Sequence, residues 1–457
     1  MQNIIQPALQ HTSQNISGRR LPSEVAESPV NPEDSYFSKT WSPPEIAAKS
    51  AAGCTFVGDP EGEAQKVVEG NGRFAVELYS KLAERKEGNL FLAPLGISTA
   101  LAMTYAGAEG ETSKEMGRVL HFNELPKENL HQAFGRVTKD LTSRLDREDC
   151  TFTVANRIWT QDGARVEEKF QKTVNDAYGA PAETLDFKDS QGATETINSW
   201  VAEKTKDKIK DLIPPGVLNE DTRMVLTNAL YFKADWADKF DPRQTFDAPF
   251  QTQEGQAVDA PTMHQTGTFK YGEFNLDEEK TASPVSKPYF MDSPAVQVLE
   301  LPYSGDDLSM VFILPKDRQT LSRVEKSLKA DQVNDWLGQL SEKKVITSIP
   351  KFNLTSSFKM KEVLSEMGMD GAFSDGADFS GISRKDNLTI GDVIHKATVE
   401  VNEQGAEGGA GTAVVMVLES CIMRDPYFTA DHPFLFAIRD KNAGILCMGR
   451  VSDPTRS

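Results

Sequence analysis

The stretch "VNEQGAEGGAGTAVVMVLES", residues 401–420, joins a run of very small side chains to an apolar run that ends beside a single acid, Glu419. Glycine-rich loops can bind phosphate, because bare backbone amides approach the oxygens and a lysine neutralises them. No lysine follows Gly411, so a phosphate loop is disfavoured. Two interpretations stay open at this point: an ordinary core strand entered through a flexible turn, or a strand held outside its sheet.

The sequence before this stretch has helical patterns first. Phe74, Leu78 and Leu82 recur every four residues and predict a helix with one apolar face that ends by Gly88. The run "GISTALAMTYAGA", which is almost wholly small or apolar, predicts a buried helix. In the run "TSKE", Thr112 and Glu115 have the spacing of a capping box at the start of a third helix.

Strand patterns follow later in the chain. "CTFTVANRIW" and "MVLTNALYFKADW" predict strands of one large sheet, and "AVQVLELPYSGDDLSMVFILPK" predicts a hairpin. We also expect a single strand over "VITSIPKFNL", a helix over "SSFKMKEVLSEMGM", a strand over "IHKATVEVN" and a closing pair over "HPFLFAIRD" and "GILCMGRVSDP". Helices first, then strands with helices among them, indicate an α+β fold.

Two segments have polar compositions that predict little order. Residues 1–65 are rich in Ser, Pro, Gln, Asn and Glu, and they cannot bury enough apolar surface to offset the entropy of ordering. We therefore expect a disordered or low-order N-terminal extension over 1–65 and one folded domain over 66–457. The run 276–294 is polar, carries prolines and predicts a surface loop.

The composition limits the partners of the chain. Its 457 residues are 39% hydrophobic, and 50 basic against 68 acidic residues give a formal charge of −18. A charge of this sign argues against nucleic acid or an anionic membrane as a partner. No apolar run reaches the roughly 20 residues of a membrane helix, and the first residues lack the charged-then-apolar order of a secretory signal. We expect a cytoplasmic protein and leave an extracellular one open, in which case the sequons at Asn15, Asn353 and Asn387 would matter.

Residues for catalysis or metal binding are not grouped in the sequence. The six histidines are scattered, and neither a His-Glu-x-x-His helix nor a Gly-x-Ser-x-Gly elbow occurs. The four cysteines have no metal-type spacing. We expect no cofactor, no metal site and no catalytic residue, and so a chain that is not an enzyme.

Several motifs together resemble the serpin family. The segment "VNEQGAEGGAGTAVV" resembles the hinge of the serpin reactive loop, and further matches are "NLFLAPLGISTALAMTYAGA", "ANRIW", "TNALYFKADW", "LELPY", "MVFILPK", "ADFSGIS", "FTADHPFLF" and "ILCMGRVSDP". They extend over about residues 68–454. The resemblance implies a fold of about nine helices and three β-sheets with a reactive loop exposed at about 403–428.

The resemblance also implies a mechanism and a partner. A target serine protease attacks the loop as a substrate and forms a covalent acyl-enzyme, and the cut loop inserts as a strand into the central sheet. The implied inhibitor is a monomer with a metastable fold. The second possibility is a serpin that has lost inhibition and serves as a binding, storage or chaperone protein.

The resemblance assigns the hinge to residues at the start of the loop: Glu403, Gly405, Ala406, Glu407, Gly408, Gly409, Ala410, Gly411 and Thr412. On one parity of an inserted strand, Ala406, Gly408, Ala410 and Thr412 would enter beneath helices, because successive side chains of a strand point to opposite faces. Inhibitory relatives usually have alanines in place of these glycines. Each glycine costs roughly 0.5–1 kcal/mol relative to alanine within a strand.

The reactive bond follows from the position of the hinge glutamate. In the family the scissile residue lies sixteen residues after it, which selects Glu419, with Ser420 following. The surrounding "VVMVLESCIM" resembles the loop of the ovalbumin-type serpin that inhibits granzyme B. A protease with a basic specificity pocket would accept Glu419, because burial of an unpaired carboxylate is costly. Cleavage at Leu418, Met423 or Arg424 by elastase-, chymotrypsin- or trypsin-like enzymes stays open.

Four other positions match structural residues of the family. His395 and Asn228 match a hydrogen-bonded pair beneath the point where the sheet opens, Lys351 matches the ion-pair partner of the hinge glutamate, and Trp236 matches a tryptophan packed at the loop entry. Ala93 and Gly96 stand where the family often has serines.

Overall fold

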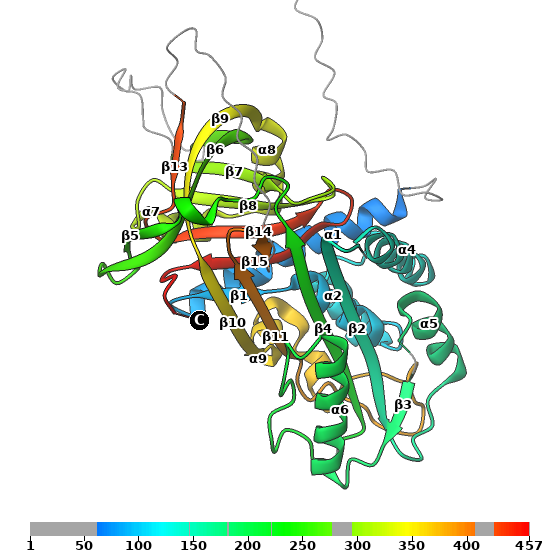
Figure 1. The fold of residues 1–457 in the computed structure, drawn as a ribbon. Helices are drawn as coiled ribbons and strands as arrows, with labels where there is room; N and C mark the ends of the chain where they lie inside the picture. The colour runs from blue at the N-terminus through cyan, green and yellow to red at the C-terminus, as the bar shows by residue number, and fades with distance from the viewer. Residues whose placement is uncertain are drawn as a thin grey trace, which may run out of the picture. The chain divides into compact units, whose positions relative to one another are not determined.

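The computed structural model describes residues 62–145, 147–180, 182–220, 222–276, 295–406 and 425–456, which all lie in the compact unit formed by residues 51–457. Nine α-helices are found in these ranges: α1 (Glu63–Arg85), α2 (Pro94–Tyr105), α3 (Gly110–Val119), α4 (Lys127–Leu145), α5 (Glu168–Tyr178), α6 (Ser190–Lys204), α7 (Thr320–Ser327), α8 (Ala330–Gln339) and α9 (Lys361–Leu364). The strands form three sheets in the same ranges (Figure 1).

The largest sheet has nine strands in the order β1-β15-β14-β8-β7-β6-β9-β13, with β5 paired to β6. Its members are β1 (Leu90–Leu92), β5 (Phe246–Gln251), β6 (Ala257–Phe274), β7 (Val296–Pro302), β8 (Leu308–Pro315), β9 (Ser341–Pro350), β13 (Tyr427–Thr429), β14 (Phe434–Asp440) and β15 (Gly444–Val451). The expected hairpin is β7–β8, and it turns through Gly305 and Asp306, which both have positive φ.

Two smaller sheets lie beside each other. One joins β12 (Gly405–Ala406), β4 (Met224–Asp235), β2 (Cys150–Gln161) and β3 (Ala182–Leu185) in that order. The other pairs β10 (Phe352–Lys359) with β11 (Ile394–Val401). The expected strands over 150–159 and 224–236 are thus found as β2 and β4, paired antiparallel, but they lie in the four-stranded sheet and not in one large sheet as expected.

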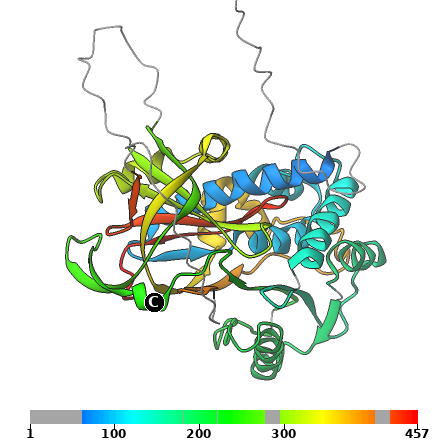
Figure 2. The same ribbon diagram turned by 45° about the horizontal axis from the view of Figure 1, so that its top comes forward.

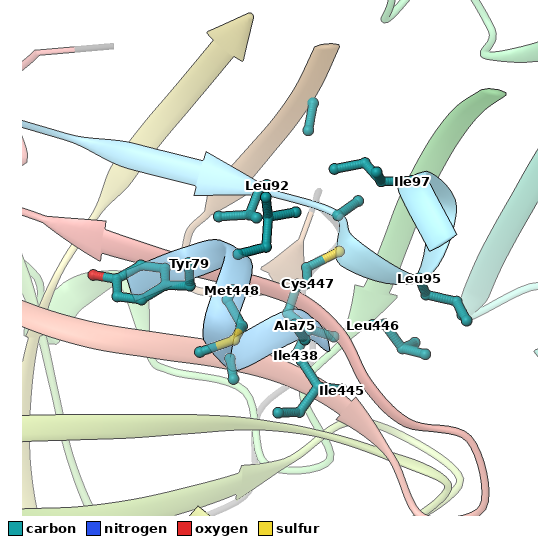
Figure 3. Packing of buried hydrophobic residues seen from close by; sticks show 14 of the residues in the cluster. Ala75, Tyr79, Leu92, Leu95, Ile97, Ile438, Ile445, Leu446, Cys447 and Met448 are labelled. Carbon is teal, nitrogen blue, oxygen red and sulfur yellow. The ribbon is translucent and has the colours of Figure 1, made fainter. Parts of the chain in front are cut away.

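The main core lies between the helices and these sheets. Helix α1 packs against α4 and against β15, and Figure 2 shows α1 and α4 side by side. In Figure 3, Ala75 and Tyr79 of α1 gather with Leu446 and Met448 of β15, and all four are buried. Most of the small or apolar run "GISTALAMTYAGA" lies in α2, which is buried along its whole length as expected.

Three local expectations were wrong. The run 345–354 is two strands in different sheets, β9 and β10, with Lys351 between them. The run 356–369 begins as β10, and helix starts only at Lys361, after which a π-helical turn covers Ser365–Met369. Since strand and helix patterns meet without a Gly or Pro signal here, the boundary was placed too early.

The third wrong expectation is the capping box at the start of α3. The helix begins at Gly110, and Thr112 Oγ1 instead accepts a hydrogen bond from the backbone N–H of Asp378 at 2.9 Å. Glu115 accepts one from Gly371 N–H at 2.7 Å. The two side chains hold a distant loop rather than their own helix end.

Helix α1 begins at Glu63, within the range expected for the N-terminal extension. The expected surface loop over 276–294 falls almost wholly outside the described residues, apart from Leu276.

Candidate functional site

The candidate site is the boundary between the two smaller sheets, called here the β4–β11 gap. Strands β4 and β11 are neighbours in space (Figure 1), yet they belong to different sheets, and no ladder joins them in the described residues. Each strand therefore has an edge of backbone N–H and C=O groups that faces the gap. Such edges can accept a further strand.

Each of the two strands that border the gap has one face towards the main core and the other face towards a second apolar cluster. Ala397, Val399 and Val401 of β11 and Leu230 and Ala234 of β4 are buried in the main core. On the opposite side a second apolar cluster, formed largely by α6 and the segment after it, includes Ala229 of β4 and contacts Ile394 of β11. A strand entering the gap would therefore be covered on both faces.

The segment after α6 lies against both sides of the gap. The Lys206 ammonium lies 5.9 Å from the ring centre of Tyr231 on β4. The ammonium of Lys396 on β11 donates to the carbonyl of Lys210 at 2.6 Å. Sequence reasoning missed this cover, because the alternating charges of "EKTKDKIKD" indicate only a solvated helix face.

The chain enters the gap through a tight hairpin after β11. Asn402 and Gly405 exchange two backbone hydrogen bonds, of 3.0 and 3.2 Å. Strand β12 then pairs antiparallel with the end of β4, with Gly405 opposite Asp235 and Ala406 opposite Ala234. Gly405 and Ala406 therefore occupy, as a short strand, the end of the gap beside Ala234 and Asp235.

Gly405 is required by this geometry. Its φ is +134°, and a Cβ at this position would lie 2.1 Å from the carbonyl oxygen of Ala234. Both the backbone conformation and the close approach exclude a side chain.

Lys351 and Glu403 form an ion pair beside the hairpin. The ammonium lies 2.9 Å from Oε2 and 3.1 Å from Oε1 of the carboxylate, and the Glu403 side chain is only 8% exposed. Burial by itself raises the pKa of Glu403, but the hydrogen bond from Lys351 and a backbone hydrogen bond outweigh it and hold the pKa below its usual value. The pair fixes the hairpin to the break between β9 and β10.

Trp236 packs directly after β4 and holds the same hairpin. Its indole N–H donates to the carbonyl of Asn402 at 2.9 Å, and its backbone N–H donates to the carbonyl of Gln404 at 2.7 Å. Its ring stacks on Tyr303, which sequence reasoning missed because nothing around "LELPY" distinguishes that residue from any buried aromatic.

His395 lies buried on β11. Its Nε2 accepts a hydrogen bond of 3.1 Å from the backbone N–H of Ala93, so the imidazole is neutral, and burial lowers its pKa to about 4. Ser356 on the neighbouring strand β10 accepts from Phe91 N–H at 3.2 Å. A serine side chain at position 93 is therefore not needed to satisfy His395. The backbone of Asn228 lies in β4, and its side chain is outside the described set.

Some predicted residues lie outside the described part of the chain. Residues 407–424 contain the remaining hinge positions, the expected reactive bond Glu419–Ser420 and the alternatives Leu418, Met423 and Arg424. Of the hinge residues, the structure describes Glu403 with its side chain, Gly405, and the backbone of Ala406.

No group of three or more His, Cys, Asp or Glu side chains that could hold a metal ion occurs in the described ranges. Over these residues, no helix combines the length and apolar character needed to cross a membrane.

The model of one protein family, described as "Serpin (serine protease inhibitor)", matches residues 69–454. The chain belongs to the serpin family. Its fold is that of a serpin, and the family description supports inhibition of serine proteases as the function of this serpin.

Individual relatives agree with the family model. This serpin is 37% identical to antithrombin-III of Mus musculus, over 84% of this chain and 81% of the relative. It is 35% identical to the leukocyte elastase inhibitor of Xenopus laevis, over 83% and 97%. The solved structure of uncleaved ovalbumin matches with a TM-score of 0.72 and 26% identity, over 85% of this chain and all of the other.

One expectation requires correction. The sequence analysis describes the chain only by the absence of enzymatic residues, whereas the comparisons support its description as an inhibitor of serine proteases. This serpin is related to proteins that act on enzymes, as inhibitors of serine proteases.

Proposed function

We propose that this serpin inhibits its target serine protease as a suicide substrate. The protease cleaves the loop at 403–428 and becomes attached to it as an acyl-enzyme ester, and the cut loop then inserts as a strand into the β4–β11 gap. One observation carries the proposal: Gly405 and Ala406 already pair with β4 at the entrance of this gap.

The register of this pairing supports insertion of a defined length. Gly405 lies opposite Asp235 and Ala406 opposite Ala234, so each further loop residue would meet the preceding residue of β4. Met416 would then meet Met224, the first residue of β4. The inserted strand would end three residues before Glu419, which would carry the attached protease to the far end of the gap.

The same register assigns faces to the hinge residues. Ala234, the partner of Ala406, is buried in the main core. Alternation along a strand would bring Gly408, Ala410 and Thr412 to that inner face and Glu407 to the outer face. Small residues at the inner positions fit between packed elements without displacing them.

Inhibition would arise from displacement of the ester. Loss of one oxyanion-hole donor typically slows such chemistry by roughly 10²–10³-fold. A protease carried along with the inserting loop would lose the alignment of its catalytic groups with the ester. Deacylation would stall, and the complex would stay covalent with one protease per serpin monomer.

We assign the reactive bond to Glu419–Ser420 and the target to serine proteases with a basic specificity pocket, such as granzyme B-like or glutamyl-specific enzymes. The position sixteen residues beyond Glu403 supports this choice. We further propose a cytoplasmic location, and a serpin domain that begins with α1 at Glu63, a few residues before the expected boundary at 65/66, and follows an N-terminal extension.

Insertion is tested by heating the uncut protein and a sample cut within the loop. We expect a large rise in melting temperature on cutting, since the new strand gains hydrogen bonds on both edges and burial on both faces. An unchanged melting temperature would favour the alternative, a non-inhibitory serpin that binds, stores or chaperones. Gly408, Gly409 and Gly411, which weaken a strand, are the sequence feature that favours this alternative.

Trapping is tested separately with granzyme B and with a glutamyl-specific bacterial protease. We expect a band that resists denaturation and has the summed mass of protease and serpin. If only an elastase-, chymotrypsin- or trypsin-like enzyme is trapped, the reactive bond lies at Leu418, Met423 or Arg424 instead.

A further inference from the structure

Two large apolar side chains are exposed in the described part of the chain, Phe246 at 58% and Tyr427 at 62%. Phe246 is the first residue of β5 and Tyr427 is the first residue of β13, and both strands belong to the nine-stranded sheet (Figure 1). Apolar side chains that are exposed singly are ordinary on a protein surface. These two are informative only if the fold places them on one face of the sheet.

The strand register places both residues on the same side of the sheet. Phe246 lies opposite Thr262 of β6. Tyr427 lies opposite Ile346 of β9, and Ile346 lies opposite Thr266 of β6. Because Thr262 and Thr266 are four residues apart on one strand, their side chains point to the same face. Strands β5 and β13 are three strand spacings apart, so Phe246 and Tyr427 lie roughly 20 Å from each other.

The other side of these strands faces the core. Met263 of β6, Val345 of β9 and Phe428 of β13 are all buried. They alternate with the residues of the first side, because successive side chains of a strand point to opposite faces. Phe246 and Tyr427 therefore stand on the solvent side of the sheet.

Between the two aromatic residues, the solvent side of these described strands carries no formal charge. It is formed there by five uncharged side chains: His264, Thr266, Ile346, Ser348 and Thr429. We call this surface, with its aromatic residues at either end, the Phe246–Tyr427 face. Charged residues make up 26% of the chain, so this face differs from the average of the molecule. Interfaces between proteins are depleted of charge at their centres and enriched in aromatic residues.

The histidine of the face is held in its neutral form. The rings of Phe246 and His264 are stacked, with centroids 4.1 Å apart and planes 13° apart. The Nδ1 of His264 lies 2.9 Å from the hydroxyl of Ser348. Burial lowers the pKa of His264 below its usual value, so the imidazole is uncharged at pH 7. Charge returns at the edge of the face, where Lys344 lies 3.1 Å from Asp425.

The chain connects this face to the expected reactive bond over a short distance. Tyr427 follows Glu419 by eight residues. Since an extended chain spans at most about 3.6 Å per residue, the bond lies within about 29 Å of Tyr427. A protease domain of about 230 residues has a radius of gyration of about 17 Å, which corresponds to a diameter of about 45 Å. A protease attached at Glu419 is therefore large enough to reach the face.

We propose that the Phe246–Tyr427 face is a second contact surface for the target protease, in addition to the reactive loop. Phe246 and Tyr427 pack against an apolar, uncharged patch beside the active-site cleft of the protease. The reactive bond selects the specificity pocket of the protease, and the face selects among proteases that share this pocket. The inference rests on the proposed function and adds a determinant of specificity to it.

Docking without chemistry tests the proposal. The probes are inactive proteases in which the catalytic serine is replaced by alanine: granzyme B, a glutamyl-specific bacterial protease, elastase, chymotrypsin and trypsin. Their binding to the full-length serpin is measured by surface plasmon resonance. We expect the parent to bind at least one probe, and the double variant Phe246→Ala/Tyr427→Ala to bind that probe on the order of thirtyfold more weakly. The variant Phe246→Tyr/Tyr427→Phe keeps both rings and should bind within about threefold of the parent.

A second pair of variants tests the uncharged centre of the face. Thr266→Glu should weaken binding about as much as the double alanine variant, because docking would bury a carboxylate without a partner. Thr196→Glu is the matched control at an exposed position on α6, a helix that packs on β2 and β4, and should bind within about twofold of the parent. The melting temperatures should stay close to that of the parent, since every replaced side chain is exposed.

Three results would overturn the proposal: no binding of any inactive protease by the parent, unchanged binding in Phe246→Ala/Tyr427→Ala, or an equal loss in Thr266→Glu and Thr196→Glu. A dimer of the parent that dissociates in Phe246→Ala/Tyr427→Ala, seen by sedimentation, would assign the face to a second copy of this chain instead.

Active proteases separate this inference from the proposed function. If they form denaturation-resistant complexes as fast with Phe246→Ala/Tyr427→Ala as with the parent, the second contact is wrong and the inhibitory mechanism stands. If the inactive enzymes bind through the face but the active ones form no such complex, the inhibitory mechanism is wrong and the second contact stands.

Discussion

The indole ring of Trp236 lies parallel to the ring of Tyr303, with centroids 4.5 Å apart and ring planes 4° apart. The stack connects the end of β4 to the turn between β7 and β8, and a backbone bridge joins the same two residues. The entrance of the β4–β11 gap is thus fixed to the large sheet.

Trp236→Phe should destabilise the uncut protein by about 1 kcal/mol, because it keeps a stacked ring but loses the hydrogen bond to the Asn402 carbonyl. Chemical denaturation of uncut protein measures this loss. The matched control is Tyr303→Phe, since within the described residues the Tyr303 hydroxyl is buried without a partner. Its removal should cost nothing, and an equal loss in both variants would show that packing alone matters.

Lys351→Met should destabilise the uncut protein by roughly 1–2 kcal/mol, because it leaves the Glu403 carboxylate buried without its cation. The loss is below that of a fully buried pair, since the Lys351 side chain is 37% exposed. In the variant Lys351→Met/Glu403→Gln much of the stability should return. The pKa of Glu403 is lowered in the fold, so its contribution is present above pH 4.5 and lost as the pH falls below this value. A double variant no more stable than Lys351→Met would contradict this account.

Gly405→Ala should convert the inhibitor into a substrate. The added Cβ cannot fit against Ala234, so the hairpin would leave β4 and the first step of insertion would be lost. We expect cleavage of the loop without a denaturation-resistant complex, measured by gel electrophoresis after mixing with the target protease. Gly391→Ala is the control, because a Cβ there meets nothing within 4 Å. Full trapping by Gly405→Ala would show that pre-insertion is dispensable.

His395 should make stability depend on pH. Its pKa is about 4 in the fold against 6.5 when unfolded, so the unfolded chain binds more protons between these values. Stability is then highest above pH 6.5 and falls as the pH drops towards 4, by roughly 3 kcal/mol from this residue. His131 contributes in the same direction, since burial also lowers its pKa to about 4.

The pH effect is measured with His395→Gln, whose side-chain oxygen can still accept from Ala93 N–H. Unfolding curves at pH 7 and pH 4.5 should show a smaller difference for this variant than for the parent. An equal pH dependence of stability in the variant and the parent would mean that folding does not lower the pKa of His395.

Glu419→Ala should lower the association rate with a glutamyl-specific protease on the order of a hundredfold or more, because the basic pocket of the protease is left without its partner. Arg424→Ala should leave the rate unchanged. The rates are measured from the residual protease activity at successive times after mixing. A lower rate in Arg424→Ala and an unchanged rate in Glu419→Ala would assign the reactive bond to Arg424 instead.

Strands β4, β7 and β8 could be predicted because their patterns are unambiguous, whereas the longest strand, β6 (Ala257–Phe274), was not predicted. Strand β4 is apolar on both parities and is covered on both faces, and β7 and β8 are separated by clear turn residues. The start of helix α9 and the roles of Thr112 and Glu115 could not be predicted, because they depend on tertiary contacts. Thr112 and Glu115 accept hydrogen bonds from a loop more than 250 residues away in the chain. Similarity to a family suggested Lys351 and Trp236, whereas Tyr303 and Lys396 act through contacts that no local pattern reveals.

The break between β4 and β11 also determines what a thermal measurement means for this serpin. If a lower-energy arrangement exists, the uncut protein persists because a barrier separates the two arrangements. Its apparent melting midpoint would then report an escape rate and shift with the heating rate. Engineering for shelf life would have to raise that barrier, and a substitution that merely improves packing in both arrangements would leave the lifetime of the active protein unchanged.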